Sequence, residues 1–513
     1  MGKLVSVKLN RWDGGIVNSA RSKSPHVCKY IGNADVVSDP YQLAPYISSE
    51  SGDAGASTSQ KQNFCMAYWT PATAQWKIFA LGVKSGAATA QILMKNLDDL
   101  SDASWDTPAA NESTTGTTSF DLFVYYPYSA TAANNKIYGA RAGTHIWAFT
   151  PDGTTAWADS HQALTYTNIA QGIVHSANNI LYIPYDNKIA QNNAGTWNTT
   201  AFTIPQSYVI TSICEYGAKL AIAAAPLSGV GNSRIFVWDM DATNTLADEN
   251  IDWGRGSIQI LEETDGYLVG ISTQSSSAAG TRFNEIVSFK YFTGSGAKTI
   301  TRLVSTSAAI TLKKNKQKLE NRIYFPMSIN IHGLLREGIW SFGFNPQGQF
   351  TVLHERTPNN DTALTSAGLI YGFLYVGDFL LQSYQTSSAF ALSKTLGTNT
   401  YSMTTIYESV VNPNMPEEDL YKEKTLKSVA VRYIAQPSAG QVVAKQRTDS
   451  TTVWSSVTAM FTDTTDSSII QEMVSNGSTQ FTKGREFEFR LEETGGTRIL
   501  ELIYTYEVNE SNA

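Results

Sequence analysis

The chain has 513 residues, a formal net charge of −7 and only 16% charged side chains. It is rich in Ser, Thr, Gly and Tyr and poor in helix-favouring runs, which indicates strands and turns. The basic residues look dispersed, which argues against a nucleic-acid reader, and no run of about 18 apolar residues could span a membrane.

Residues 1–55 are expected to form an extended N-terminal arm and the first strands. The stretch "KLVSVKL", residues 3–9, alternates as a strand does. Residues 9–25 carry too many Gly, Asn, Ser and Arg for a core, yet Trp12 and Ile16 need burial. We therefore expect the arm to dock on the propeller or on a neighbouring subunit.

Two distant stretches are near copies of each other: "HIWAFTPDGTTAW" at 145–157 and "GIWSFGFNPQGQF" at 338–350. In both, an Ile-Trp strand precedes a Pro-x-Gly turn, where Pro fixes φ and Gly accepts a positive φ. Similar strands recur, and each closes a hairpin with the strand before it. Their anchors are Ile78, Ile146, Ile189, Ile235, Ile286, Ile339 and Ala389, at spacings of 68, 43, 46, 51, 53 and 50.

The spacing predicts an all-β protein with a β-propeller of about seven blades over residues 56–407, because blades repeat every 40 to 50 residues. The long first spacing contains residues 98–119, a polar segment interpreted as an inserted loop. A stack of β-sandwiches is the alternative. "VWDMD" lacks an upstream Gly-His pair, so the repeats are not standard WD repeats.

Residues 408–424, with two prolines and a cluster of charges, are expected to be a linker. Downstream, "REFEFRLE" and "RILELIYTYEV" alternate strictly between apolar and polar side chains. Residues 425–513 are therefore predicted to form a small antiparallel β-sandwich.

The sequence nominates no catalytic, cofactor-binding or metal-binding residue. The six histidines lack metal-binding spacings, there is no GxSxG, and three distant cysteines form no zinc or disulfide pattern. "TPDGTTAW" departs from the Asp box of propeller sialidases and is interpreted as a hairpin turn. "DMDATN", 239–244, lacks the Gly and Glu of a calcium loop and is interpreted as a solvated turn.

Two further features have structural interpretations. Glu262-Glu263 and Glu417-Glu418 are taken as solvent charges, because neighbours on a strand point apart. Aromatic residues such as those of "VYYPY", 124–128, could stack on sugars, although core or inter-blade packing is the commoner role.

Family resemblance comes from the layout. "NRWDGGIVNSAR" and "YQLAPYISSES" near the start, repeated propeller strands, and the ending "FTKGREFEFRLEETGGTRILELIYTYEV" resemble tail proteins of tailed bacteriophages, of the propeller-containing nozzle or tail-tip type. Proteins at the end of a short tail are often longer than this chain.

The resemblance implies a non-enzymatic structural component of the phage virion, made in the bacterial cytoplasm. It implies a cyclic homo-oligomer that contacts other tail proteins (adaptor, fibres or tail-tip neighbours), needs no cofactor and does not insert into a membrane. DNA could pass without specific binding if the acidic balance lines an inner wall. Alternatives are a receptor-binding module for host glycan and, with less support, a propeller glycosidase with two convergent carboxylates in its central pocket.

Overall fold

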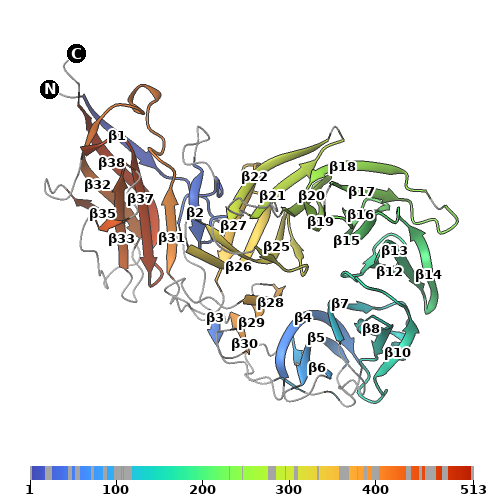
Figure 1. Ribbon diagram of the computed structural model, residues 1–513. Coiled ribbons are helices and arrows are strands. Elements are labelled where there is room, and N and C mark those ends of the chain that lie inside the picture. Colours follow the sequence, from blue (N-terminus) through green and yellow to red (C-terminus); the bar gives the residue numbers. More distant parts are fainter. Residues whose placement is uncertain are drawn as a thin grey trace. The chain divides into compact units, whose positions relative to one another are not determined.

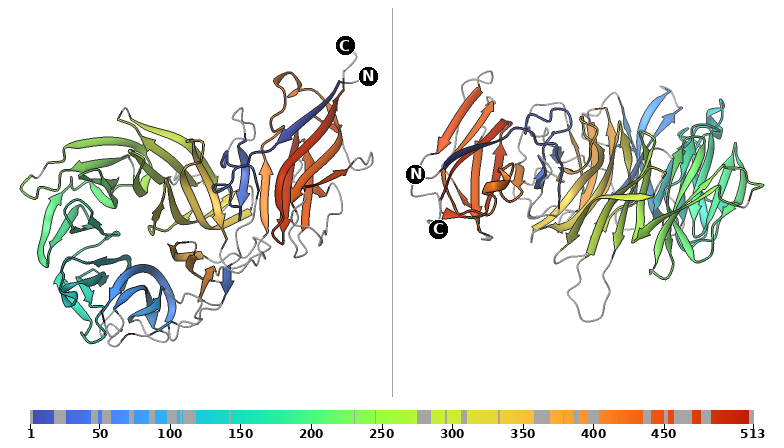
Figure 2. Two further views of the ribbon diagram at one scale, coloured as in Figure 1. Left: turned by 180° about the vertical axis from the view of Figure 1, so that it is seen from behind. Right: turned by 90° about the horizontal axis from the view of Figure 1, so that it is seen from above.

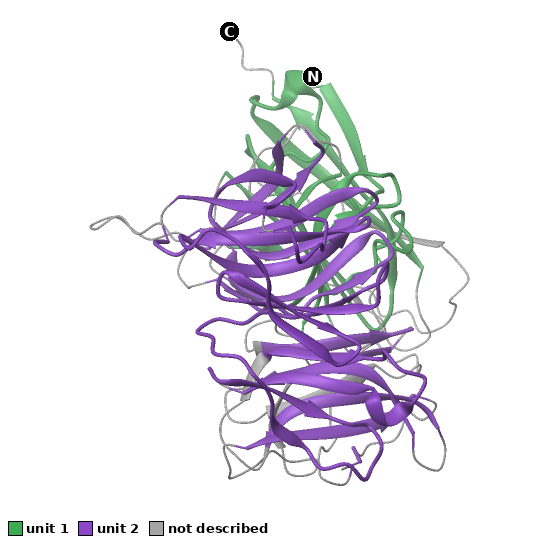
Figure 3. Ribbon diagram, turned by 90° about the vertical axis from the view of Figure 1, so that its right-hand side faces the viewer, with its two compact units in different colours: residues 1–48, 339–365, 397–513 green, residues 49–338, 366–396 purple. Residues whose placement is uncertain are grey.

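The computed structural model describes most of the chain in many segments. The described residues are 3–17, 26–43, 49–51, 58–70, 74–84, 89–97, 105–106, 108, 118–141, 143–229, 231–244, 246–274, 285–294, 296–305, 310–331, 334–357, 369–377, 379–385, 390–395, 404–434, 441–449, 453–456, 470–475 and 483–509. They form two compact units (Figure 3): unit 1 is 1–48, 339–365 and 397–513, and unit 2 is 49–338 and 366–396.

Unit 2 consists of small antiparallel sheets whose strands follow chain order, as the blades of a propeller do (Figure 1). Blade I is β4 (Thr58–Trp69), β5 (Gln75–Lys84) and β6 (Ala90–Asn96). Blade II is β7 (Thr118–Tyr126), β8 (Lys136–Arg141), β9 (His145–Phe149) and β10 (Ala158–Ala163), with a short 3-10 helix, η1 (Ala132–Asn134), between β7 and β8. Blade III is β11 (Ile173–His175), β12 (Ile180–Tyr185), β13 (Lys188–Asn193) and β14 (Thr196–Thr203).

The remaining blades continue the series. Blade IV is β15 (Tyr208–Tyr216), β16 (Lys219–Pro226), β17 (Asn232–Trp238) and β18 (Glu249–Arg255). Blade V is β19 (Ser257–Thr264), β20 (Tyr267–Gln274), β21 (Glu285–Phe292) and β22 (Ala297–Ser305). Blade VI is β23 (Thr311–Leu312), β24 (Gln317–Leu319), β25 (Arg322–Ile331), β26 (Leu334–Phe344) and β27 (Phe350–Arg356), and the chain passes from unit 2 to unit 1 within β26. Blade VII is β28 (Leu369–Val376), β29 (Phe379–Gln385), β30 (Phe390–Thr395) and β3 (Ser49–Ser51).

The blades close on themselves within unit 2, as Figure 2 shows from behind. Strand contacts link neighbouring blades: β4 with β7, β12 with β15, β15 with β19, β22 with β25, β25 with β28, and finally β28 with β4. Blades II and III share one apolar cluster that includes Leu122 and Leu181. The predicted propeller of about seven blades is thereby confirmed, and its first strands line the axis.

The N-terminal strand β3 closes the last blade. Its residues Ser49–Ser51 pair with Ser393–Thr395 of β30, at the outer edge of blade VII. Because this pairing joins segments more than 340 residues apart, it ties the start of the propeller to its end. Residues 1–55 were expected to hold an extended arm and first strands, with the propeller starting at residue 56; β3 instead belongs to the propeller, although no local pattern assigns it to that sheet.

The two copied stretches occupy equivalent positions. Each begins on the third strand of its blade, β9 or β26, and both turn glycines adopt the positive φ that the Pro-x-Gly pattern predicts: 70° at Gly153 and 73° at Gly348. Trp147 of β9 lies directly opposite Gly139, where an added Cβ would approach its Cζ2 to 2.0 Å. The glycine therefore makes room for the indole between strands.

Blade I departs from the predicted alignment. Ile78 lies on β5, the second strand, whereas the anchors from Ile146 to Ile339 lie on third strands. The third strand of blade I is β6, whose Ile92 precedes Ile146 by 54 residues. The proposed loop at 98–119 also has an ordered part: Asp106 exchanges two backbone hydrogen bonds with Met94, and Trp105 is buried beside Phe64. The anchor Ala389 lies outside the described residues, immediately before β30.

Unit 1 is a two-sheet β-sandwich, as the C-terminal alternation predicts. One sheet holds β1 (Lys3–Leu9), β38 (Arg498–Val508), β32 (Lys424–Ile434), β35 (Ile470–Ser475) and β36 (Lys483–Gly484). The other holds β27, β2 (Cys28–Gly32), β31 (Thr405–Ser409), β37 (Phe487–Thr494), β33 (Gln441–Thr448) and β34 (Ser455–Ser456). The inward residues meet between the sheets: the rings of Phe489 and Tyr504 lie 4.6 Å apart.

The boundaries of unit 1 differ from the predicted domains 1–55, 56–407, 408–424 and 425–513. Strand β1 pairs along its length with β38, and Trp12 packs edge-on against Tyr407 at 4.9 Å, so much of the arm belongs to the sandwich. The predicted linker contains the second short 3-10 helix, η2 (Glu417–Asp419), and its Asp419 is fully buried and accepts a 3.1 Å hydrogen bond from Tyr506. The contacts of β1 and Trp12 span hundreds of residues and that of Asp419 spans 87, so no local sequence pattern predicts them.

Candidate functional site

The axis of the propeller is occupied by a segment of blade VI. Its inner strand is split into β23 and β24, and residues 313–316 between them face only two residues of β25. One of these is Pro326, which accepts a hydrogen bond from the Lys313 N–H and has no N–H to donate in return. Because Pro326 cannot donate a backbone hydrogen bond, the pairing between the inner strand and β25 is interrupted here, and residues 313–316 bulge out of the sheet.

This axial segment, Leu312–Lys318, reads "LKKNKQK" and contacts several blades. Asn315 donates to Asn63 of blade I at 2.7 Å, and Gln317 exchanges two hydrogen bonds with Tyr375 of blade VII. Lys313 lies 4.8 Å from the ring centroid of Tyr371. The segment therefore crosses the space that an open propeller channel would use.

Lys316 is the most enclosed contact of the axial segment. Its ammonium donates to the carbonyls of Ile213 and Leu261 and lies 2.9 Å from Glu262. Lys318 pairs with Glu263 at 3.0 Å, with both side chains more exposed. The interpretation of Glu262 and Glu263 as solvent charges is wrong, because both pair with lysines of the neighbouring blade.

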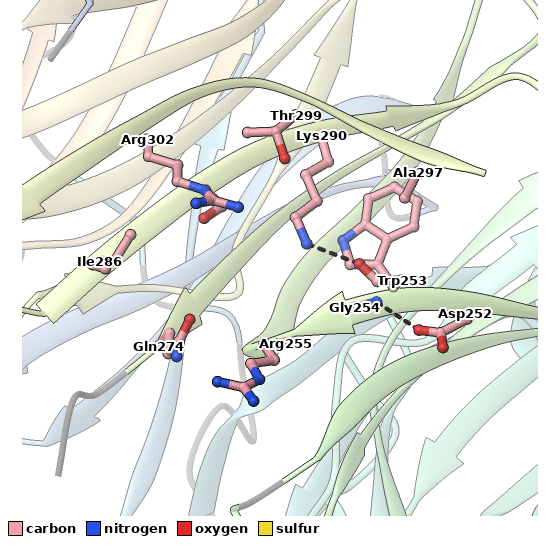
Figure 4. A pocket seen from close by; sticks show the side chains of 11 residues that line it. Asp252, Trp253, Gly254, Arg255, Gln274, Ile286, Lys290, Ala297, Thr299 and Arg302 are labelled. Carbon is pink, nitrogen blue, oxygen red and sulfur yellow. Dashed lines mark hydrogen bonds between the residues drawn. The ribbon is translucent and has the colours of Figure 1, made fainter. Parts of the chain in front are cut away.

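A cleft of about 510 Å³ lies between the outer part of blade IV and blade V (Figure 4). Strand β18 supplies Asp252, Trp253, Gly254 and Arg255, and blade V supplies Gln274, Ile286, Ser288, Lys290, Ala297, Thr299 and Arg302. We call this the blade IV–V cleft. The strand register of blade V brings its cleft residues together. Lys290 lies opposite Gly270 and Thr299, and Ser288 lies opposite Arg302, so these side chains share one face of the sheet.

Trp253 shapes the floor of the cleft. It is 1% exposed, and a Cβ on Gly270 would come within 2.6 Å of its Cζ2. Lys290 donates to the Trp253 carbonyl at 2.8 Å, and burial, together with nearby Arg302, lowers the pKa of this lysine. The glycine and the lysine thereby fix the position of β18 against blade V.

The charges in the cleft are unequal. Arg255, Lys290 and Arg302 face a single carboxylate, Asp252, whose oxygens already accept hydrogen bonds from Asn232 and the Gly254 N–H. The hydrogen bond from Asn232 is the main cause that lowers the pKa of Asp252. Neither arginine forms a hydrogen bond or an ion pair with any residue in the described part of the chain.

An exposed aromatic pair lies on blade I. Tyr68 and Trp76 are directly opposite across β4 and β5, with ring centroids 5.9 Å apart, and they are 36% and 45% exposed. Tyr125 of blade II packs edge-on against Trp76 at 5.9 Å. The pair gives this part of blade I an accessible aromatic surface, which the sequence did not locate.

The motifs weighed from sequence have structural roles. Asp152 caps the turn of "TPDGTTAW" by accepting the N–H groups of Thr154 and Thr155, and Asp241 of "DMDATN" does the same for Thr243. Tyr126 of "VYYPY" is buried and donates to the Asn179 carbonyl. Across the described ranges, no group of three or more His, Cys, Asp and Glu side chains is placed to hold a metal ion.

Other candidates from the sequence are packed. His354 is stacked on Trp340 at 4.6 Å and shares a 2.6 Å hydrogen bond with Tyr30. The cysteines are free thiols, and burial raises the pKa of Cys28, Cys65 and Cys214. His332 lies outside the described residues. Where the chain is described, it contains no helix long and apolar enough to cross a membrane.

Comparison with known proteins gives a fold likeness only. No protein-family model and no curated protein matches the sequence. The β-propeller domain of the Trilobed protease from Pyrococcus furiosus matches at 10% identity and a TM-score of 0.35, over 68% of this chain and 96% of that one. A chain from Chaetomium thermophilum Polycomb Repressive Complex 2 matches at 8% and 0.40, over 70% and 100%.

A sialidase from Trypanosoma rangeli also matches, at 9% identity and a TM-score of 0.28, over 89% of this chain and 96% of that one. At these scores the likenesses carry no argument about function. The propeller assignment rests on the sheets and contacts described above.

Proposed function

We propose that this chain is a non-enzymatic structural component of a tailed-phage virion, a nozzle or tail-tip protein that assembles into a ring and contacts neighbouring tail proteins. The phage assignment is supported by the sequence resemblance in the arm and the C-terminal strands. The assembly role is supported by one structural feature, the outer edge of the sandwich at β1.

Strand β1 ends its sheet and pairs, among the described strands, only with β38. An edge strand offers backbone donors and acceptors to a strand of another chain. Leu4 of β1 is 64% exposed and Tyr421 is 69% exposed, and Glu418, three residues before Tyr421, contacts Lys3 at 3.4 Å. The subunits of a ring contact each other head to tail, so one surface of each subunit must bind a different surface of the next. The free edge of β1 and the exposed side chains beside it can supply one of these surfaces.

The axial segment supports the absence of glycosidase chemistry. A propeller glycosidase would hold two convergent carboxylates in its central pocket. Here the pocket beside the axial segment is lined by one carboxylate, Asp121, among its described residues, and the nearby Glu262 and Glu263 are each paired with a lysine. The same segment crosses the propeller axis, so any DNA passage would use the lumen of the ring and not the propeller.

The assembly role is tested by light scattering coupled to size exclusion over a range of protein concentrations. The wild type should form a species with a fixed subunit number, and the double variant Leu4→Glu, Tyr421→Ser should shift it to monomer. Leu246→Glu is the matched control, since Leu246 is 74% exposed in unit 2 and lies far from β1 in the sequence. A wild type that stays monomeric at every concentration, or equal disruption by Leu246→Glu, would overturn the proposal.

A second function, binding of host glycan, is favoured by Tyr68 and Trp76. Exposed aromatic rings can stack on the apolar faces of sugars, and these two rings lie beside each other on blade I. A glycan array compares the wild type with Trp76→Ala. Specific signals that disappear in the variant would support this function, and an empty array would count against it.

A further inference from the structure

We propose that the blade IV–V cleft is a binding site for a small ligand with two acidic groups, either a phosphorylated sugar or a short acidic saccharide. The inference does not rest on the tail assignment. It is carried by the charges, the fixed floor and the size of the cleft.

The charge balance selects an anion. Three basic side chains line the cleft against one carboxylate, and that carboxylate is already satisfied by Asn232 and Gly254. Arg255 and Arg302 come from different blades and have no partner among the described residues. A guanidinium presents a planar fork that binds carboxylate, sulfate or phosphate through two hydrogen bonds, so two separated forks fit a ligand with two acidic groups.

The floor supplies a further donor that is ready for a ligand. The indole Nε1 of Trp253 is buried and has no hydrogen-bond partner among the described residues. Figure 4 shows this nitrogen on the side of the ring that faces the Lys290 ammonium. A buried donor without a partner is unfavourable, and a hydrogen-bond acceptor on a ligand in the cleft would satisfy it.

The floor is held before any ligand arrives. The contact of Trp253 with Gly270 and the hydrogen bond from Lys290 fix the indole and the ammonium in place. Ser288, Gln274 and Thr299 add polar groups that can recognise hydroxyls. The volume of about 510 Å³ lies in the range of roughly 300–1,000 Å³ that small-ligand sites occupy.

Calorimetric titration of the purified full chain tests this site. The probes are fructose 1,6-bisphosphate and digalacturonate, and the dimethyl ester of digalacturonate is the uncharged control. We expect saturable binding of at least one acidic probe, none of the ester, and weaker binding at higher salt because the attraction is screened. Binding of the bisphosphate identifies a phosphorylated ligand, and binding of digalacturonate identifies an acidic saccharide.

Variants distinguish binding in the cleft from nonspecific attraction of the acidic probes to surface cations. Arg255→Gln and Arg302→Gln should each weaken binding at least tenfold, while their melting temperatures stay near the wild-type value because both side chains are exposed. Lys298→Gln is the matched control, an exposed cation of β22 outside the cleft. The proposal is overturned if neither acidic probe binds at millimolar concentration, or if Lys298→Gln weakens binding as much as the arginine variants do.

Discussion

Glu493 is a buried carboxyl group whose titration links stability to pH. It lies on β37 in the sandwich, and burial raises its pKa from the ordinary value to about 8, although its Oε1 accepts a hydrogen bond from the Thr497 N–H. Hydrogen bonds from the Thr405 side chain and the Gly496 N–H oppose this shift without cancelling it. Between pH 4.5 and 8 the folded state therefore holds a proton that the unfolded state releases.

It follows that the free energy of unfolding should fall as pH rises through this window, since the folded state binds more protons there. Glu493→Gln keeps the shape and removes the charge, so the fall should become smaller and the variant should be more stable than wild type at pH 8. Urea denaturation of both proteins at pH 5 and pH 8 measures this. Parallel pH profiles of the two proteins would contradict a neutral Glu493.

Lys316 and Lys318 allow a comparison between an enclosed and an exposed ion pair. Lys316→Met would leave Glu262 and the carbonyls of Ile213 and Leu261 without their cation, at a cost of about 2–3 kcal/mol. Lys318→Met should cost less than about 1 kcal/mol, because its pair with Glu263 is solvated. Chemical denaturation measures the free energy of unfolding of both variants. Equal losses of stability would contradict the idea that Lys316 holds the axial segment in place.

At the scale of elements, close packing between Trp253 and Gly270 joins blades IV and V. Gly270→Ala should destabilise the protein by about 1–3 kcal/mol, because its Cβ would overlap the indole. In the background of Trp253→Leu the same substitution should cost much less, since the smaller side chain leaves room. A double-mutant cycle by thermal or chemical denaturation measures this coupling, and additive effects of the two substitutions would refute it.

The sequence predicts elements well where the signal is local. The Pro-x-Gly pattern after Ile-Trp predicts the positive φ of Gly153 and Gly348, and the alternation near the C-terminus predicts strands β37 and β38. It fails where pairing joins distant segments. Strand β3 pairs with β30 in the last blade, and β1 pairs with β38 near the C-terminus. Nothing in the sequence of either strand predicts its partner.

The candidate sites were missed for a related reason. The cleft joins β18 to blade V, and its cations come from three separate strands, so their convergence exists only in the folded protein. The axial lysines were visible as "KKNKQK", a local cluster that the overall acidic charge obscured. Four lysines within six residues, placed between two halves of one interrupted strand, were the available signal.

At the scale of the whole molecule, the chain forms one propeller and one sandwich, and it passes from one unit to the other several times. Unit 1 takes segments from the start, the middle and the end of the sequence, and the propeller is an insertion within it. The unpaired edge of β1 and the exposed Leu4 and Tyr421 belong to the sandwich. We therefore place the subunit contacts of the proposed ring on unit 1.

Negative-stain imaging of the purified full chain at high concentration tests this account most directly. We predict rings with a central opening and a single subunit number, which the Leu4→Glu, Tyr421→Ser variant fails to form. Fields that contain only separate monomers, at concentrations where the protein is folded, would contradict a ring-forming component of a phage tail.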